Sequence, residues 1–262
     1  MRFAVGFSAM KKTLIFLILS CTLFTAFGWG ATGHRAVGYI AEQHLSKKAR
    51  LAIERILRGQ SLAMSGTWMD DIKSDSLYDH THDWHWVTIQ NGETYEQSVK
   101  NAKGDLVMTL ERLIAELKSK KLNPRQEAEH LKMIVHLIGD IHQPLHVGFG
   151  TDQGGNQVKV TWFGANSNLH RVWDSDMIDG SKLSYTELAN AWPKADATRV
   201  KSLQQATVRD MANEAMTFRK QVYAYGDGKL GYDYNYQNFN TVLEQIQKAG
   251  IRLAGVLNQI YG

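Results

Sequence analysis

The chain has 262 residues, which is enough for one sizeable core or at most two domains. Cys21 is its only cysteine, so disulfide bonds do not stabilise the fold. The formal charge of +4 says little about binding partners, because Arg2, Lys11 and Lys12 lie in an N-terminal segment without acidic residues.

Residues 1–28 have the features of a secretory signal peptide. Basic residues precede an apolar run over 14–19, and Ala26-Phe27-Gly28 places small residues at the −3 and −1 positions of a cleavage site. The run is shorter than the ~20 residues of a membrane-spanning helix, although a retained anchor is the alternative. We expect cleavage after Gly28, export to the periplasm or the extracellular space, and no stable membrane association afterwards.

The periodicity of apolar residues after the signal predicts mainly helices. The predicted helices cover 32–45, 47–57, 61–71, 95–117, a segment that begins at Pro124, 169–177, 185–192, 207–225 and 236–261. Two alternating stretches, 85–89 and 157–163, predict short strands that can pair with each other. Residues 79–83 are expected to form a polar loop. No repeat or linker interrupts the sequence, so residues 29–262 are predicted to form one mainly α domain.

The stretch from Val135 to His146 is the densest group of candidate metal ligands. His136 and Asp140 are four residues apart, so a helix places them on one face beside apolar neighbours. An imidazole and a carboxylate at this spacing can bind one metal ion. For one such pair alone, a core histidine that is salt-bridged to an aspartate is the alternative.

Other stretches supply the same types of ligand. His170 and Asp174 repeat the spacing of His136 and Asp140, and all ten histidines follow the signal segment. The full candidate set is His34, Asp70, His85, His136, Asp140, His146, His170 and Asp174. Nitrogen and carboxylate ligands without cysteine suit catalytic zinc, which takes about three protein ligands, so two or more ions are indicated. Asp140 is expected to bridge two ions ~4 Å apart.

These pieces, in this order, resemble the S1/P1 nuclease family, which consists of secreted, zinc-dependent enzymes that cut single-stranded DNA and RNA. The matching segments span nearly the whole mature chain. They are Trp29-Gly30-x-x-Gly33-His34, Trp68-x-Asp70, His85, Val135-His136-x-Ile138-Gly139-Asp140, Gln143-Pro144-Leu145-His146, Gly154-Gly155-Asn156 and Asn168-Leu169-His170-x-x-Trp173-Asp174. The resemblance implies a bacterial member with a helical bundle of the phospholipase C/P1 nuclease type and a short β-hairpin. The disulfides of the fungal members are missing.

The resemblance also implies three zinc ions and a ligand set for each. The three sets are Asp70, His85, His136 and Asp140; the amine and carbonyl of Trp29 with His34 and Asp140; and His146, His170 and Asp174. The amine of Trp29 becomes a ligand only when the peptide bond after Gly28 is cut. An uncleaved chain therefore lacks one expected ligand.

The implied reaction is hydrolysis of phosphodiester bonds by zinc-activated water, which gives 5′-phosphate products, together with a 3′-nucleotidase activity. Two close zinc ions lower the pKa of a shared water towards ~7, and the resulting hydroxide attacks phosphorus. Asp70 is expected to orient this water. Lys73 stands where the family often has arginine and keeps the positive charge without the bidentate fork. A solvated surface lysine is its alternative.

Two residues are candidates for substrate binding. Trp86 stands where the family has an aromatic residue that stacks on a base, which contributes ~1–3 kcal/mol and favours single strands. A buried strand residue is its alternative. Asn156 matches a family asparagine near the site, and its alternative is a turn residue. Thr88 replaces an aspartate that reads the base in fungal members, which leaves base preference open.

Two other functions remain open at this point. A zinc phospholipase C shares the fold and an N-terminal tryptophan, and a non-catalytic zinc-binding protein would bind metal without turnover. The Gly33-His34 and Asn168-Leu169-His170 motifs favour the nuclease. We expect a monomer that acts on single-stranded DNA, RNA and 3′-nucleotides. The remaining histidines are assigned to the surface or to support of the site: His44, His80, His82, His130 and His142.

Overall fold

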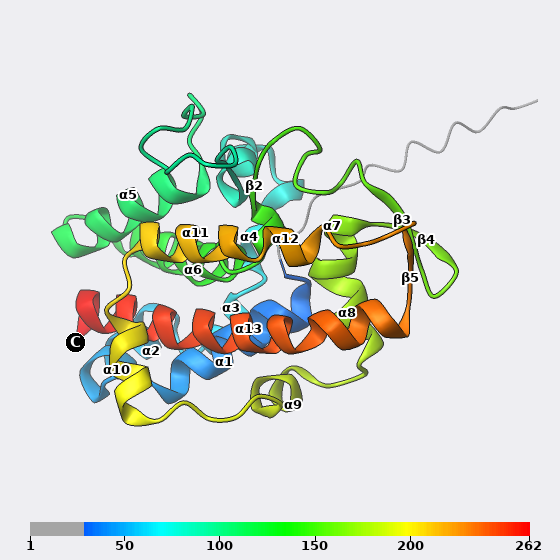
Figure 1. Cartoon of the computed structure of the whole chain (residues 1–262). Coiled ribbons are helices and arrows are strands. Elements are labelled where there is room, and N and C mark those ends of the chain that lie inside the picture. Colours follow the sequence, from blue (N-terminus) through cyan, green and yellow to red (C-terminus); the bar gives the residue numbers. More distant parts are fainter. Residues whose placement is uncertain (1–28) are drawn as a thin grey trace, which may run out of the picture.

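The computed structural model describes residues 29–262 (Figure 1). The expected signal peptide lies outside the described residues. The described part is mainly helical, which confirms the predicted fold class. Within it, no helix has both the length and the apolar character that crossing a bilayer requires.

Helices make up most of the described chain. The α-helices are α1 (Ala31–Gln43), α2 (Lys47–Ile56), α3 (Leu62–Ser65), α4 (Trp68–Asp71), α5 (Leu106–Ser119), α6 (Pro124–Asp140), α7 (Leu169–Arg171), α8 (Met177–Gly180), α9 (Tyr185–Asn190), α10 (Ala197–Gln204), α11 (Val208–Thr217), α12 (Arg219–Val222) and α13 (Tyr232–Tyr261). Shorter turns of helix are η1 (Ile72–Ser74), η2 (Ser76–His85), η3 (Pro144–His146) and the π-helical turn η4 (Val172–Asp176).

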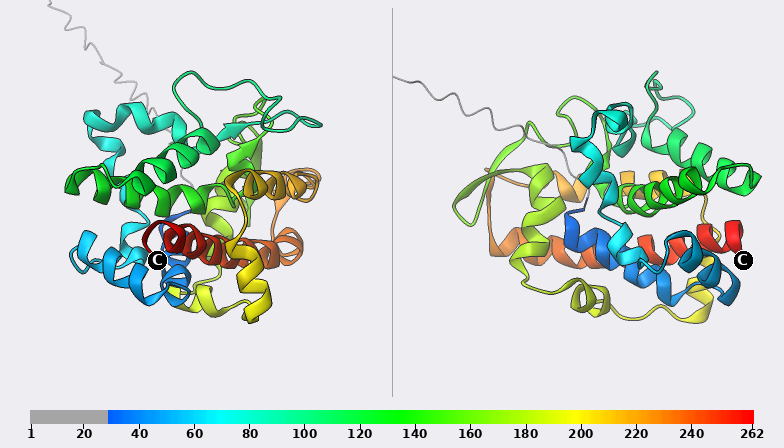
Figure 2. Two further views of the ribbon diagram at one scale, coloured as in Figure 1. Left: turned by 90° about the vertical axis from the view of Figure 1, so that its left-hand side faces the viewer. Right: turned by 180° about the vertical axis from the view of Figure 1, so that it is seen from behind.

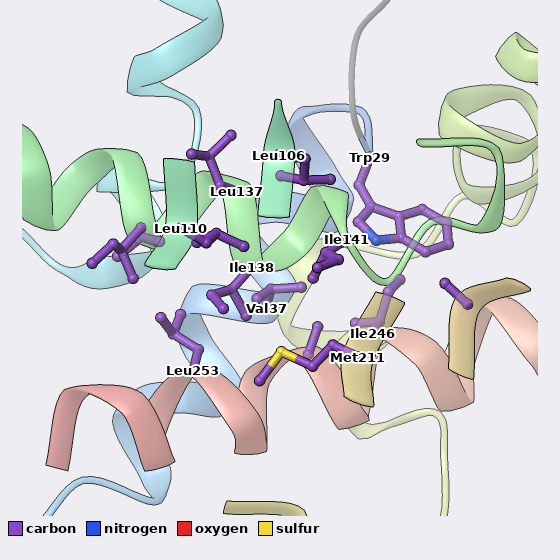
Figure 3. Packing of buried hydrophobic residues seen from close by; sticks show 14 of the residues in the cluster. Trp29, Val37, Leu106, Leu110, Leu137, Ile138, Ile141, Met211, Ile246 and Leu253 are labelled. Carbon is purple, nitrogen blue, oxygen red and sulfur yellow. The ribbon is translucent and has the colours of Figure 1, made fainter. Parts of the chain in front are cut away.

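The long helix α13 forms the spine of the bundle. It packs against α1, α2, α5, α6 and α10, and the ribbon views show it running through the length of the molecule (Figures 1 and 2). A Cβ built on Gly250 would lie 2.5 Å from the Cβ of Ile40, so only glycine permits this approach of α1 to α13. Val37 of α1, Ile138 of α6 and Leu253 of α13 meet in the core (Figure 3).

Helix α6 carries the central motif, and its start is strongly specified. The Asn123 side chain accepts hydrogen bonds from the first turn, the Gln126 side chain bonds back to the Asn123 backbone, and Pro124 occupies the first helical position. The second half of α6, from Met133 to Asp140, is buried throughout. The capped start therefore helps to determine which face of α6 its later residues present to the core.

The strands are short and pair differently from the prediction. β1 (Val87–Thr88) pairs in parallel with β2 (Val147–Gly148), whereas β3 (Lys159–Trp162) forms an antiparallel hairpin with β4 (Ala165–Asn168) and also pairs with β5 (Lys229–Leu230). The expected pairing of 85–89 with 157–163 is therefore wrong. Phe163 and Gly164 both have positive φ, which makes the tight turn of the hairpin, so β4 and β5 occupy both edges of β3.

The helix predicted over 95–117 begins only at Leu106. Gly104 has a φ of +98°, and the Asp105 side chain accepts a hydrogen bond from the Met108 amide, so the helix is capped there. Val99, which falls within the predicted helix, is 91% exposed. Residues 79–83 lie in η2 and not in a loop. Helix α10 was not predicted, because its own apolar periodicity is weak.

Candidate metal centre

Histidine and aspartate side chains from separate elements converge around the C-terminal end of α6. Three groups each bring their ligand atoms within 4.8 Å of one another. The groups are His34, His136 and Asp140; Asp70, His85 and His136; and His146, His170 and Asp174. These are the eight side chains that the sequence singled out, and the structure brings all of them together.

Asp140 lies between the first two groups. Its Oδ1 is 3.3 Å from His34 Nε2, while its Oδ2 is 2.9 Å from His85 Nδ1 and 3.3 Å from His136 Nε2. Burial alone would raise the pKa of Asp140, but the imidazoles of His136 and His146 hold this pKa well below its ordinary value. The fully buried carboxylate therefore stays anionic and faces a different group with each oxygen.

Asp70 stands at the more exposed side of the centre. Its Oδ1 is 3.7 Å from His136 Nε2 and 2.6 Å from Lys73 Nζ. The side chains of Asp70 and Lys73 both remain slightly exposed. Burial opposes ionisation of Asp70, but His136 and Lys73 lower its pKa below the ordinary value. Lys73 is therefore paired with a candidate ligand. It is not a solvated surface lysine, which was the alternative.

The third group is assembled by the π-helical turn after α7. His170 and Asp174 lie one turn apart, with His170 Nε2 2.9 Å from Asp174 Oδ2, and His146 Nε2 is 3.7 Å from Asp174 Oδ1. The buried Gln143 amide donates to the same Oδ1, a role that the sequence analysis did not assign. The position of Gln143 in the family motif Gln143-Pro144-Leu145-His146 was the only feature of the sequence that could have indicated this contact.

Backbone carbonyls orient three of the imidazoles. The Nδ1 of His136 lies 2.7 Å from the Gly66 oxygen, that of His146 2.6 Å from the His85 oxygen, and that of His170 2.6 Å from the Gly154 oxygen. Each carbonyl can only accept, so Nδ1 carries the proton and Nε2 is directed at the centre. Outer contacts of this kind fix the tautomer that metal-binding histidines need.

The donor set fits a divalent cation. Four buried nitrogen and oxygen atoms of these side chains have no hydrogen-bond partner among the described residues: His34 Nδ1 and Nε2, His85 Nε2 and Asp140 Oδ1. An unsatisfied buried polar atom costs ~1–3 kcal/mol, so such a concentration at one point needs a compensating ligand. Burial lowers the pKa of His85 to about 3, which keeps this imidazole neutral and able to coordinate.

Trp29 lies beside this centre. Its side chain is fully buried and packs against Gly33, and its indole also lies near Gly139, on which a Cβ would meet the His34 ring at 2.7 Å (Figure 3). The Gly30 amide donates to the Asp174 carbonyl at 2.7 Å. The start of the described chain is therefore held between His34 and Asp174.

A groove with a volume of about 540 Å³ opens beside the third group. His146 and His170 line this groove, together with Trp86, Thr88 and Asn156. Trp86 is half-buried at the end of η2, so it is not a core strand residue. The Asn156 side chain bonds the Gln153 carbonyl within a turn, yet it also borders the groove.

His82 and His142 have surroundings that the sequence did not reveal. His82 lines the groove, with its ring 5.4 Å from that of Trp86. His142 is buried two residues beyond Asp140, where it contacts the Ile138 carbonyl and Arg252 of α13. His142 therefore joins the helix of the metal centre to the spine of the bundle.

The comparisons with known proteins cover the same part of the chain. The family model of S1/P1 Nuclease matches residues 29–262. Endonuclease 4 of Arabidopsis thaliana is 28% identical over 281 residues, which cover 94% of this chain and 93% of that protein. Endonuclease 3 of the same plant is 29% identical over 294 residues, with 98% and 97% covered. Nuclease P1 of Penicillium citrinum is 29% identical over 272 residues, with 89% and 98% covered.

Removal of metal should destabilise the protein. A cation at ~100 times its dissociation constant stabilises the folded state by ~2.7 kcal/mol. At this chain length that corresponds to a fall in Tm of roughly 5–10 °C after treatment with a chelator. Thermal unfolding monitored by circular dichroism measures the shift, with a zinc-saturated chelator as the control. An unchanged Tm would contradict a metal-dependent centre.

Proposed function

The chain belongs to the S1/P1 nuclease family and is thus a hydrolase of phosphodiester bonds, and we propose that it is a zinc-dependent endonuclease specific for single strands. Its products would be 5′-phosphates from DNA and RNA, and 3′-nucleotides would be a second class of substrate. The observation that carries the proposal is the position of Asp140, which faces two adjoining groups of ligands with a third group close by.

Zinc suits a site made of imidazole and carboxylate groups without thiolates. When bound, zinc lowers the pKa of water and offsets negative charge on a phosphoryl group. The proposed ligands are Trp29, His34, Asp70, His85, His136, Asp140, His146, His170 and Asp174. They all come from one chain, which supports a monomer as the active unit.

Asp70 and Lys73 would act at the mouth of the centre. The Asp70 carboxylate is ionised and slightly exposed, so it can accept a hydrogen bond from the attacking water as well as bind metal. Lys73 holds Oδ1 of this carboxylate at 2.6 Å and adds a positive charge that favours an anionic phosphodiester.

The N-terminal segment has a chemical role in this proposal. We place a signal peptide at 1–28, and its removal would free the amine of Trp29 close to His34. Export to the periplasm or the extracellular space would precede activation, because the complete ligand set requires the cut. The buried position of the Trp29 side chain supports this assignment.

The experiment that tests the proposal combines metal analysis with three substrates. The purified mature chain should contain close to three zinc ions, cleave single-stranded DNA and release phosphate from a 3′-nucleotide. It should not release phosphocholine from lecithin. Lecithin turnover without nuclease activity would establish a phospholipase C, and bound zinc with no turnover would establish a binding protein.

Asp140→Asn should remove two of the three ions and reduce kcat on single-stranded DNA by at least ~10³-fold, because the amide cannot supply two anionic donors. Elemental analysis and a nuclease assay measure the two effects. Asp179→Asn, which makes the same change at an exposed position, is the matched control. Full zinc occupancy with normal turnover in Asp140→Asn would show that this residue is not a bridge.

Trp86→Ala should reduce kcat/KM on single-stranded DNA roughly 5- to 150-fold, which corresponds to a stacking contribution of ~1–3 kcal/mol. Trp86→Phe keeps an aromatic face and should recover most of the activity. Zinc content should be the same in both variants. Equal kcat/KM values for the alanine variant and the unmodified protein would rule out stacking at this position.

A further inference from the structure

A second groove, with a volume of about 1090 Å³, lies where α2 ends and α6 begins. Helix α6 also contacts α4 and η2 there. The basic and aromatic side chains that line the groove are Arg55, Arg58, Trp68, Tyr78, Arg125 and Lys132. None of them belongs to the metal centre or to the groove beside Trp86.

The second groove has an excess of positive charge. Four cationic side chains line it against two carboxylates, those of Glu127 and Glu129. Glu129 and Arg125 offset each other's charge, since Glu129 Oε1 lies 2.7 Å from Arg125 Nε. The same oxygen accepts the Tyr78 hydroxyl at 2.9 Å. Arg55 and Arg58 are exposed, and neither forms an ion pair with any acidic residue in the described range 29–262. The groove therefore favours a polyanion.

One face of α6 connects this groove to the metal centre. Arg125, Glu129, Lys132 and His136 are spaced four, three and four residues apart, so they form a single stripe along the helix. Lys132 lies ~6 Å before His136 along the axis, and Arg125 lies ~16 Å before it. The face of α6 that presents His136 to the metal site thus also bears basic side chains at increasing distance from that site.

Helix α4 makes the same connection from the other wall. Trp68 is two residues from Asp70 on this helix. Its ring lies 5.2 Å from Lys132 Nζ and 5.5 Å from the Tyr78 ring, which meets it edge-on. Aromatic rings placed among cations are the combination that binds single-stranded nucleic acid, because bases stack while phosphates are neutralised.

We propose that this second groove binds the single strand of nucleic acid as it continues beyond the cleavage centre, an inference that rests on the nuclease function proposed above. Arg55, Arg58 and Arg125 would contact phosphates, and Trp68 with Tyr78 would contact bases. A track of ~16 Å holds about five stacked nucleotides at ~3.4 Å each. Long strands would therefore bind more tightly than substrates that reach only the metal centre.

The test compares long and short substrates in a double variant, Arg55→Gln with Arg58→Asn. Glutamine preserves helix propensity in α2, and asparagine tolerates the positive φ of 53° at position 58. The control is Lys194→Gln with Lys201→Gln, which removes the same charge from exposed positions. Helix α10, which carries Lys201, lies across α13 from α2 (Figure 2, left).

Two readouts are measured on the zinc-loaded protein. The first is the ratio of kcat/KM on a single-stranded 20-mer to kcat/KM on a dinucleotide, and we expect the groove variant to lower it about tenfold at low salt. The second is the affinity for a hydrolysis-resistant phosphorothioate 20-mer, measured by fluorescence anisotropy. Loss of two phosphate contacts should reduce the slope of log affinity against log salt by ~1.4.

The control variant should match the unmodified protein in both readouts. A groove variant that also matches it would overturn the inference, as would an equal loss on the 20-mer and the dinucleotide. The proposed nuclease function would be contradicted by a different result, namely that the unmodified protein cleaves neither substrate. In that case the phosphorothioate affinities still decide whether the second groove binds a strand.

Discussion

The carboxylate of Asp140 is fully buried among imidazoles, and the arrangement of this end of the molecule follows from that position. A buried anion needs compensating positive charge. Burial lowers the pKa of His34 and of His85, so these two imidazoles are neutral and supply lone pairs instead. The stacked rings of His34 and His136, 3.8 Å apart, gather further nitrogen atoms at the same point. A divalent cation would satisfy the carboxylate and these lone pairs together, which supports the interpretation of the site as a metal centre.

The ligands are positioned by helices whose ends and packing are well defined. Helix α6 is capped at Asn123 and buried over its second half, α1 packs closely on α13 at Gly250, and Trp29 packs against Gly33. Carbonyl groups then hold the imidazoles in one tautomer. The centre is thus built on helices, while half-buried aromatic side chains and basic side chains line the two grooves.

The sequence could predict what depends on neighbouring residues and on family motifs. The spacing of His136 and Asp140 placed both on one face of α6, and apolar periodicity located most helices. Long-range pairing was less accessible, because helices α5 and α6 separate β1 from its partner β2 in the chain and two-residue strands have almost no periodicity of their own. Convergence of ligands that lie far apart in the chain came from the family resemblance. The pairing of Lys73 with Asp70 and the support from Gln143 required coordinates.

The position of metal around Asp140 can be measured directly. The measurement is X-ray diffraction from crystals of the zinc-loaded mature protein, recorded on both sides of the zinc absorption edge. We expect three anomalous peaks, two of them on opposite oxygens of Asp140 and the third among His146, His170 and Asp174. Peaks confined to surface histidines, or an Asp140 that touches no ion, would contradict this expectation.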